Sequence, residues 1–222
     1  MALGYFYPGA DLVATQPSSG LPEKASAQLR AMQKTPTFVM VGTVEPRKGH
    51  ALVLDAFERL WSEGVDADLV IVGRHGWMSD SLAARLKTHP QAGKRLSWLE
   101  QASDEYLEKI YDVSVALIAA SAAEGFGLPL VEASQRGLPV IARDIPVFRE
   151  VSGDYPTYFD GGDITSLTMA LRQAALSPVS TESSKPHNAL DWQTTTGVLW
   201  EMLFNQDHEQ WLPAWTISRI TD

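Results

Sequence analysis

The sequence alternates short apolar runs with longer amphipathic stretches, and this alternation limits the possible folds more than any other feature. Two of the apolar runs, Thr37–Val41 and Asp68–Val72, each end directly at a glycine, Gly42 or Gly73. After the first run, apolar residues in His50–Glu63 recur at helical spacing. Runs that are apolar throughout are typical of strands that are buried on both faces of a parallel sheet.

The alternation continues to residue 176 and predicts a doubly wound α/β fold, which is a Rossmann-like parallel sheet with helices on both faces. The other strands are expected at Arg95–Leu99, Ser114–Ala120, Leu138–Ala142 and Tyr155–Phe159. The other helices are expected at Ser79–Thr88, Asp104–Tyr111, Leu128–Arg136, Asp163–Leu176 and Asp191–Phe204. In such a sheet, a ligand binds beyond the carboxyl ends of the strands.

The two ends of the chain differ from this regular part. We expect residues 1–36 to form a hinge and linker with at most a short helix after Pro22, because the segment is rich in Ser, Pro, Gly and Ala. We expect residues 37–190 to form the Rossmann-like domain, with a polar loop at its end, and residues 191–222 to form C-terminal helices. Trp211 and Trp215 leave two interpretations open for the tail: a final helix on the same domain, or a segment that packs on a separate domain.

The composition excludes several classes of function. The net charge of −9 argues against nucleic-acid binding, which needs a basic face. The chain has no cysteine, and its five histidines lack metal-ligand spacing, so neither thiol chemistry nor a metal site is predicted. No apolar run reaches the roughly 18–20 residues of a membrane span, and no signal peptide is recognisable. We therefore expect a cytoplasmic protein, for which a peripheral contact with the inner face of a membrane stays compatible.

Three loops could hold a ligand at the carboxyl edge of the sheet. The stretch Glu124–Ala133 follows a predicted buried strand and opens a helix on a glycine turn, where free N–H groups favour an anion. The loop Gly42–Gly49 contains adjacent cations that suit phosphate oxygens, although such a pair can equally be solvated surface. The loop Gly73–Trp77 could approach a ligand closely, but a turn in which Trp77 covers the core is favoured slightly.

In two of these loops, the exact order of residues is more specific than their charge and flexibility. Glu124-Gly125-Phe126-Gly127-Leu128-Pro129 with Glu132-Ala133 resembles the donor-site motif of glycosyltransferase family 4, the retaining enzymes of GT-B architecture. Gly42-Thr43-Val44-Glu45-Pro46-Arg47-Lys48-Gly49 resembles the phosphate loop of the same family. The resemblance covers about Tyr7 to Phe204, and the form with Gly-Thr-x-Glu-Pro-Arg-Lys is similar to bacterial mannosyl- and other hexosyltransferases of surface polysaccharide assembly.

The resemblance implies a role for each matching residue. Arg47 and Lys48 would hold the donor diphosphate and, with Glu124, form the catalytic set; Glu124 would contact hydroxyls of the transferred sugar. Backbone N–H groups would come from Gly125, Phe126 and Gly127, ribose contacts from Glu132, and a base pocket from Trp98, Leu99 and Glu100. Gly42, Thr43, Gly73 and Leu128 complete the expected donor site. Many members have Arg where this chain has Thr43, so the second diphosphate cation is assigned to Arg47.

The resemblance also implies what binds and what is missing. The donor would be a GDP- or UDP-linked sugar, the acceptor a glycan or lipid-linked glycan, and no metal would be needed. Only the C-terminal, donor-binding half of a GT-B enzyme is expected here, so the chain alone would be weakly active or inactive without an N-terminal acceptor domain. A non-catalytic nucleotide-sugar-binding or subunit-assembly module is the alternative interpretation, and an unrelated flavodoxin-like domain is a more remote one.

Overall fold

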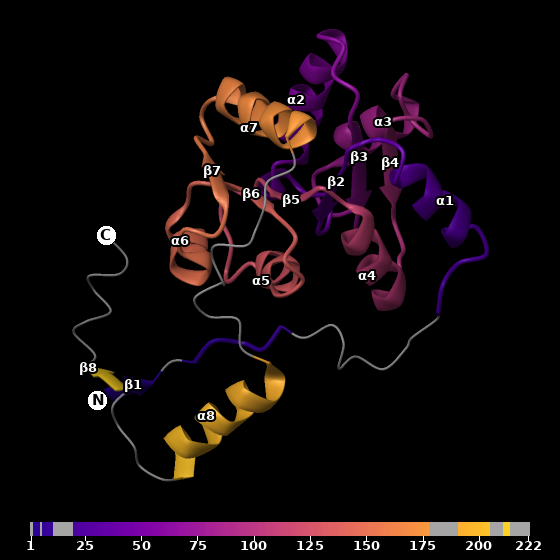
Figure 1. Ribbon diagram of the computed structural model, residues 1–222. Helices are drawn as coiled ribbons and strands as arrows, with labels where there is room; N and C mark the ends of the chain where they lie inside the picture. The colour runs from indigo at the N-terminus through magenta and orange to yellow at the C-terminus, as the bar shows by residue number, and fades with distance from the viewer. Residues whose placement is uncertain (1, 5, 11–19, 178–190, 205–210, 214–222) are drawn as a thin grey trace.

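A six-stranded parallel sheet is the centre of the computed structural model (Figure 1). The structure describes residues 2–4, 6–10, 20–177, 191–204 and 211–213. The strands of the sheet are β2 (Thr37–Val41), β3 (Asp68–Val72), β4 (Leu96–Leu99), β5 (Ala116–Ala119), β6 (Val140–Arg143) and β7 (Thr157–Phe159). Their order is β4-β3-β2-β5-β6-β7, so the strand order reverses between β2 and β5. This gap is the topological switch point, where ligands of doubly wound sheets bind.

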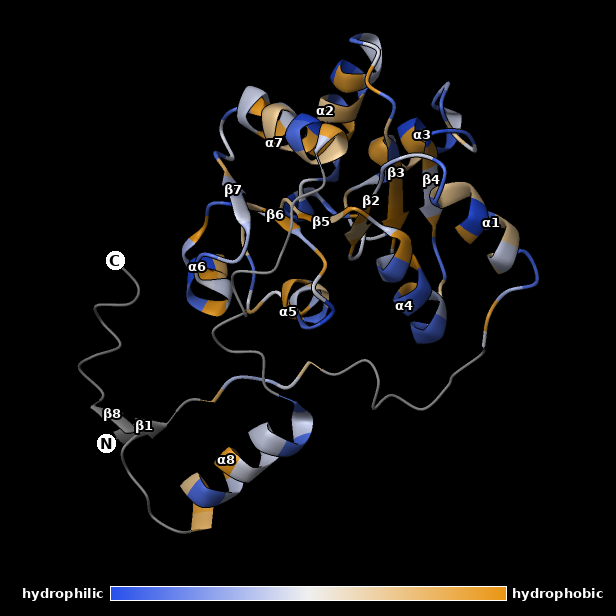
Figure 2. Cartoon of the chain, viewed as in Figure 1, coloured by the Kyte–Doolittle hydropathy of each residue, from blue (hydrophilic) through white to orange (hydrophobic). Residues whose placement is uncertain are grey.

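Helices cover both faces of the sheet. The helices α2 (His50–Ser62), α3 (Asp80–Thr88) and α7 (Ile164–Leu176) contribute to one apolar core, and α1 (Ala25–Met32), α4 (Asp104–Val113), α5 (Leu128–Gln135) and α6 (Pro146–Ser152) contribute to the other. The pleat of each strand divides its residues between these cores, as in β2, where Phe38 and Met40 enter the first and Val39 enters the second. Figure 2 shows β3 mostly orange between these layers. Each fully buried Phe or Leu side chain contributes about 1.5–3 kcal/mol to folding.

Local signals fix where several helices begin. Ser103 accepts a hydrogen bond from the N–H of Tyr106 at 3.2 Å and thereby caps α4. Asp163 caps α7 in the same way, through the N–H groups of Thr165 and Ser166. In α2 the residues Val53, Leu54, Phe57 and Leu60 are buried, which places one face of this helix on the sheet.

An N-terminal segment with β1 (Ala2–Gly4) and a C-terminal segment with α8 (Trp192–Phe204) and β8 (Trp211–Pro213) lie outside the six-stranded sheet. Strand β1 pairs antiparallel with β8, and α8 precedes β8 in the chain. The segment after β1 reaches the domain, since Ala10 is buried with Val131 and Val151 of α5 and α6. The ring of Tyr7 also lies 5.7 Å from that of Phe126.

The predicted α/β fold is confirmed, and each predicted strand or helix in the sheet domain is present with ends that shift by no more than two residues. The short helix allowed after Pro22 is present as α1, and Ala25 and Met32 bury it against the second core. The helix α6 was not predicted, because Pro146–Ser152 is short and lies between two strands without an apolar period.

Three finer expectations need correction or fall away. Trp77 does not cover the core, because 59% of its surface is exposed. The predicted C-terminal helix is wrong at Trp211–Pro213, which is a strand. The predicted polar loop at 178–190 and the tail around Trp215 lie outside the described residues.

Candidate functional site

The loops that follow β2 and β5, residues 42–49 and 120–127, meet at the switch point of the sheet. Gly49 lies at the end of the first loop with φ of 79°. A Cβ atom at Gly49 would lie 2.4 Å from the carbonyl oxygen of Ala120 in the second loop. The close approach of the two loops therefore requires a glycine at this position.

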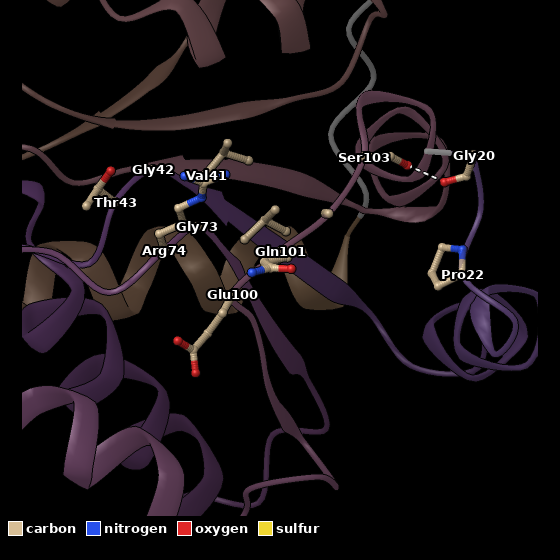
Figure 3. Close-up of a pocket in the computed structure, with 12 residues that line it drawn as sticks. Gly20, Pro22, Val41, Gly42, Thr43, Gly73, Arg74, Glu100, Gln101 and Ser103 are labelled. Carbon is tan, nitrogen blue, oxygen red and sulfur yellow. Dashed lines mark hydrogen bonds between the residues drawn. The ribbon is translucent and has the colours of Figure 1, made fainter. Parts of the chain in front are cut away.

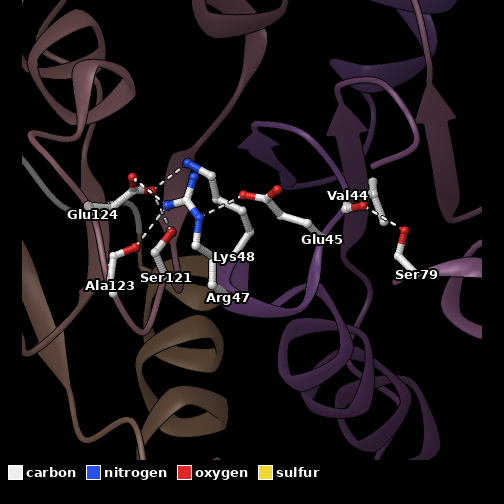
Figure 4. Close-up of polar contacts among 8 residues, drawn as sticks. All are labelled: Val44, Glu45, Arg47, Lys48, Ser79, Ser121, Ala123 and Glu124. Atoms are coloured by element: carbon white, nitrogen blue, oxygen red, sulfur yellow. Dashed lines mark hydrogen bonds and ion pairs between the residues drawn. The ribbon is translucent and has the colours of Figure 1, made fainter. Parts of the chain in front are cut away.

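Three charged side chains, Arg47, Lys48 and Glu124, join these loops, and we call them the charged corner (Figure 4). Lys48 Nζ lies 2.5 Å from Glu124 Oε1, and Arg47 Nη1 lies 3.1 Å from Glu124 Oε2. The Ser121 hydroxyl also donates to Glu124 Oε1 at 2.7 Å, while Arg47 Nη1 donates to the Ala123 carbonyl at 3.0 Å. The corner thus places two cations and one acid where the two loops touch.

The corner keeps its acid ionised. Burial alone would raise the pKa of Glu124, but hydrogen bonds from Lys48 and Ser121, with the charge of Lys48 and a further bond from Arg47, outweigh it and lower this pKa. Glu124 is therefore a carboxylate at physiological pH and can accept hydrogen bonds from hydroxyl groups. The two cations suit the oxygens of a diphosphate, and the nearby N-terminus of α5 adds N–H groups that favour an anion.

A buried histidine lies at the start of α2, directly after the loop that carries the two cations. His50 is 1% exposed. Burial and the neighbouring Lys48 ammonium lower the pKa of His50 to about 4, so its ring is neutral at physiological pH. The positive charge of this loop therefore comes from Arg47 and Lys48.

A cavity of about 690 Å³ opens beside the corner, across the carboxyl ends of β2, β3 and β4 (Figure 3). This volume lies within the usual range for small-molecule sites. A Cβ atom at Gly73 would lie 2.0 Å from the carbonyl oxygen of Gly42, so two glycines let the ends of β2 and β3 approach each other here. The cavity is lined by Gly42, Thr43, Gly73, Arg74, Glu100, Gln101, Ala102 and Ser103, with Gly20 and Pro22 on another wall and Val41 and Val72 between.

The three expected base-pocket residues, Trp98, Leu99 and Glu100, together line a separate pocket of about 290 Å³, and of the three only Glu100 also borders the larger cavity. Glu100 lines the cavity, but its carboxylate pairs with Lys87 at 2.8 Å. Trp98 and Leu99 are not among its lining residues. The Trp98 indole donates to the carbonyl of Gly73 at 2.8 Å, and its ring packs against the first core. Trp98 thus supports the backbone that borders the cavity.

The second acid of the motif, Glu132, lies inside α5 and apart from the charged corner. Its Oε2 accepts a hydrogen bond from the Tyr111 hydroxyl at 2.9 Å. Burial raises the pKa of Glu132, and the charge of Asp104 adds to this, against the lowering effects of Tyr111 and Arg136. Within the described part of the chain, no group donates to Oε1 of Glu132, which leaves this atom able to accept a ligand hydroxyl.

The glycine turn between the two acids is arranged around its aromatic residue. The Phe126 ring packs against the buried Ala10, Val131 and Val151. Gly125 is exposed, and α5 begins at Leu128, which is 38% exposed. A narrow recess lined by Lys48, Glu124, Gly127 and their neighbours lies between this turn and the loop after β2.

Sequence reasoning missed part of the site. Arg74 and Gln101 line the cavity directly after β3 and β4, so the same rule that selected the other loops could have found them. Gly20 and Pro22 come from a predicted linker, and no local signal places them at the cavity. The Ser103 hydroxyl fixes this wall by donating to the Gly20 carbonyl at 2.6 Å.

The described residues contain neither a metal-binding cluster nor a membrane-spanning helix. No group of three or more His, Cys, Asp or Glu residues among them is placed to hold a metal ion. None of the helices in the described part of the chain is long and apolar enough to cross a membrane.

The fold and the site together define a class of protein. A doubly wound sheet with cations, an acid and a small-molecule cavity at its switch point is typical of α/β proteins that bind nucleotides. The sequence model of the family Glycosyl transferases group 1 matches residues 22–188, and the chain belongs to this family.

Two mannosyltransferases are among the proteins with similar sequences. The chain is 54% identical over 168 residues to "Serotype-specific mannosyltransferase WbdA" of Escherichia coli, a match that covers 76% of this chain and 21% of that protein. It is 30% identical over 166 residues to "O-antigen chain mannosyltransferase B" of Escherichia coli, covering 74% of this chain and 42% of that one. The chain therefore spans about a fifth of the length of the WbdA proteins that it matches.

Solved structures share the fold. Sucrose-phosphate synthase from Thermosynechococcus elongatus superposes with a TM-score of 0.70 at 23% identity, covering 90% of this chain and 52% of that one. Anabaena HepE in complex with UDP and glucose superposes with a TM-score of 0.69 at 19% identity, covering 89% of this chain and 55% of that one. This likeness confirms the Rossmann-like architecture that GT-B glycosyltransferases have.

Proposed function

We propose that this chain is the donor-binding domain of a retaining glycosyltransferase of family 4. The enzyme transfers a hexose, mannose or a similar sugar, from a nucleoside diphosphate to a glycan or lipid-linked acceptor in surface polysaccharide synthesis. The observation that carries the proposal is the meeting of Arg47, Lys48 and Glu124 at the switch point, beside a cavity large enough for a nucleoside. The 54% identity to a mannosyltransferase supports mannose as the sugar.

The donor lies along the carboxyl edge of the sheet in this proposal. Its base and ribose occupy the cavity, with Glu132 reaching the ribose hydroxyls, and its diphosphate lies at Arg47 and Lys48. The sugar lies near Glu124 and the glycine turn Gly125–Gly127. The cavity and the corner share the loop after β2, which supports this order.

The proposed chemistry needs charge stabilisation at the diphosphate. When the bond between the sugar and the diphosphate breaks, negative charge grows on the leaving group. Arg47 and Lys48 stabilise this charge, and such fixed charges in a partly water-excluded site lower the barrier without reorganising. Glu124 accepts hydroxyls of the transferred sugar and keeps it in place while the acceptor attacks from the same face. The mechanism assigns no step to a metal ion.

The acceptor site is proposed to lie on a separate N-terminal domain. The chain covers about half of each of the two similar solved structures named above, which supports a second domain in the complete enzyme. In this arrangement the chain alone binds the donor and transfers sugar weakly or not at all. The complete enzyme works in the cytoplasm, where nucleotide sugars are its substrates, with a lipid-linked acceptor bringing it to the inner face of the membrane.

A binding panel tests the proposal. The melting temperature of the chain is measured with millimolar GDP, UDP, ADP, GDP-mannose and UDP-glucose, because a ligand at 100 times its Kd stabilises the folded state by about 2.7 kcal/mol. We expect one nucleoside diphosphate to raise the melting temperature by several degrees. Lys48→Ala should abolish most of this shift, because it removes a cation from the diphosphate.

The matched control is Lys109→Ala, which removes a lysine that pairs with Asp112 on the outer surface of α4. This variant should bind as the wild type does. A chain that no nucleotide in the panel stabilises would count against the proposal, as would equal shifts in Lys48→Ala and the wild type.

A further inference from the structure

Glu45 is a buried acid next to the charged corner. It is 7% exposed, and its Oε1 lies 2.8 Å from Nε of Arg47. The backbone before it is fixed, since the Val44 N–H donates to the Arg74 carbonyl at 2.8 Å and the Val44 carbonyl accepts from the Ser79 hydroxyl at 2.7 Å. The carboxylate of Glu45 therefore starts from a rigid position.

Arg47 thus lies between two carboxylates. Its Nε is held by Glu45 and its Nη1 by Glu124, as Figure 4 shows. The two acids differ in how many groups they hold, because Glu124 also accepts from Lys48 and Ser121. In the described part of the chain Glu45 pairs only with Arg47.

A sugar that reaches Glu124 has to compete with the groups already bound there. Both oxygens of Glu124 are engaged, Oε1 by Lys48 and Ser121 and Oε2 by Arg47. The side chain of Arg47 is 44% exposed, so it would leave the corner readily once Oε2 is diverted to a hydroxyl. Holding a long, exposed side chain in one geometry costs conformational entropy, and a second fixed partner reduces this cost.

We propose that Glu45 is a positioning residue that keeps Arg47 at the diphosphate while Glu124 is engaged by the sugar of the donor. This proposal rests on the proposed function, since it requires a donor with both a diphosphate and a sugar. Glu45 contacts neither part of the donor and acts only through Arg47. Its contribution therefore depends on whether the bound ligand carries a sugar.

This dependence can be tested, because a purely structural role of Glu45 would change the Kd of both kinds of ligand equally. The Kd of GDP and of GDP-mannose is measured by calorimetry for the wild type and Glu45→Gln, or those of UDP and UDP-glucose if the panel selects UDP. With GDP alone, Glu124 still holds Arg47, so the Kd should rise by no more than about twofold. With GDP-mannose, Arg47 loses the Glu124 carboxylate to the sugar and, in Glu45→Gln, its second carboxylate as well, so only uncharged acceptors such as the Ala123 carbonyl hold it, and the Kd should rise about tenfold, the size of one good charged contact.

The matched control is Glu58→Gln, which neutralises another acid that is paired with an arginine. Glu58 lies on α2, and its Oε2 is 2.8 Å from Nη2 of Arg85. It should leave both Kd values unchanged. Arg47→Lys gives a second route if Glu45→Gln does not fold, because lysine lacks the Nε–H and cannot be held by two acids through separate nitrogens. It should show the same larger loss for GDP-mannose.

The outcomes separate the two proposals. Equal losses for GDP and GDP-mannose, or no loss for either, would overturn the role of Glu45 and leave the proposed function standing. A wild type that binds neither a nucleoside diphosphate nor its sugar conjugate would overturn the proposed function and the role of Glu45 with it.

Discussion

Glu124 and Glu132 belong to the same short stretch of sequence, yet the structure gives them opposite surroundings. Glu124 lies in the loop between β5 and α5, where two cations and a hydroxyl donate to it and lower its pKa. Glu132 lies inside α5, where burial and Asp104 raise its pKa and, among the described residues, only the Tyr111 hydroxyl donates to it. The neighbouring cations favour the ionised form of Glu124. The surroundings of Glu132 disfavour its ionised form, so ionisation there lowers the stability of the fold.

The difference separates two ways of building a binding site. In the charged corner the acid already pairs with both cations, so the corner is stable before any ligand arrives, and a ligand has to exchange partners there. The pair of Tyr111 and Glu132 is less well compensated, so a ligand that donates to Glu132 supplies what the protein lacks. The same residue type can therefore stabilise the fold at one place and be retained for binding at the other.

Matched substitutions at the two acids should give the largest effects on stability, and of opposite sign. Because the folded-state pKa of Glu124 is lowered, its charge stabilises the fold above its unfolded pKa, and this stability is lost as the pH falls through the folded pKa. Glu124→Gln, which leaves Lys48 and Arg47 without their acid, should lower the free energy of unfolding at pH 7 by about 1–3 kcal/mol. Because the pKa of Glu132 is raised, its neutral form fits the fold better, and Glu132→Gln should raise that free energy by up to about 1 kcal/mol.

Urea unfolding at pH 7 measures both changes, and a repeat in mild acid supplies the control. As the pH falls toward the ordinary range for a glutamate, Glu132 takes up its proton first, so the advantage of Glu132→Gln should disappear. The deficit of Glu124→Gln should persist to lower pH than the advantage of Glu132→Gln. Changes of the same sign for the two variants at pH 7 would contradict the comparison.

An effect smaller than that of Glu124→Gln is expected from the Tyr111 hydroxyl, which donates to Glu132. Tyr111→Phe leaves one oxygen of a half-buried carboxylate without its donor, and should lower the free energy of unfolding at pH 7 by about 1–2 kcal/mol. Protonated Glu132 depends less on this donor, so the loss should shrink as the pH is lowered. Tyr155→Phe is the matched control, because the Tyr155 hydroxyl donates to the Leu138 carbonyl, which does not titrate in this range. A loss at Tyr111 that is as independent of pH as that at Tyr155 would show that Glu132 is not its cause.

The sequence predicted the fold because its signals are local. The apolar runs Thr37–Val41 and Asp68–Val72 identify strands by themselves, and the rule that ligands bind beyond strand ends selects the loops that follow them. Resemblance to a family then named Lys48 and Glu124 as site residues. That assignment stays a prediction, although the structure brings the two side chains together across 76 positions of sequence.

Contacts that depend on the folded chain were out of reach of the sequence. Nothing in the local sequence of Tyr111 indicates that its hydroxyl meets Glu132, because the pair forms only when α4 packs beside α5. Gly20 reaches the cavity only because Ser103 of the α4 cap binds its carbonyl. The opposite pKa shifts of Glu124 and Glu132 have the same origin, since each depends on partners that the fold supplies.

The smallest expected effect concerns how nucleotide binding responds to pH. The Kd of GDP, or of whichever nucleoside diphosphate binds, is measured between pH 7.5 and pH 5 for the wild type and for the two Gln variants. Protonation of the phosphate itself affects all three proteins, so the ratio of variant to wild-type Kd removes it. For Glu132→Gln the ratio should fall from about threefold at pH 7.5 as the pH is lowered, because the raised pKa of wild-type Glu132 makes it take up a proton more readily than an ordinary glutamate, and the proposed charge-assisted bonds to the ribose weaken with its charge. For Glu124→Gln the ratio should stay constant, because the cations of the corner keep Glu124 ionised throughout. A ratio that changes for Glu124→Gln and not for Glu132→Gln would reverse the assignment of the two acids.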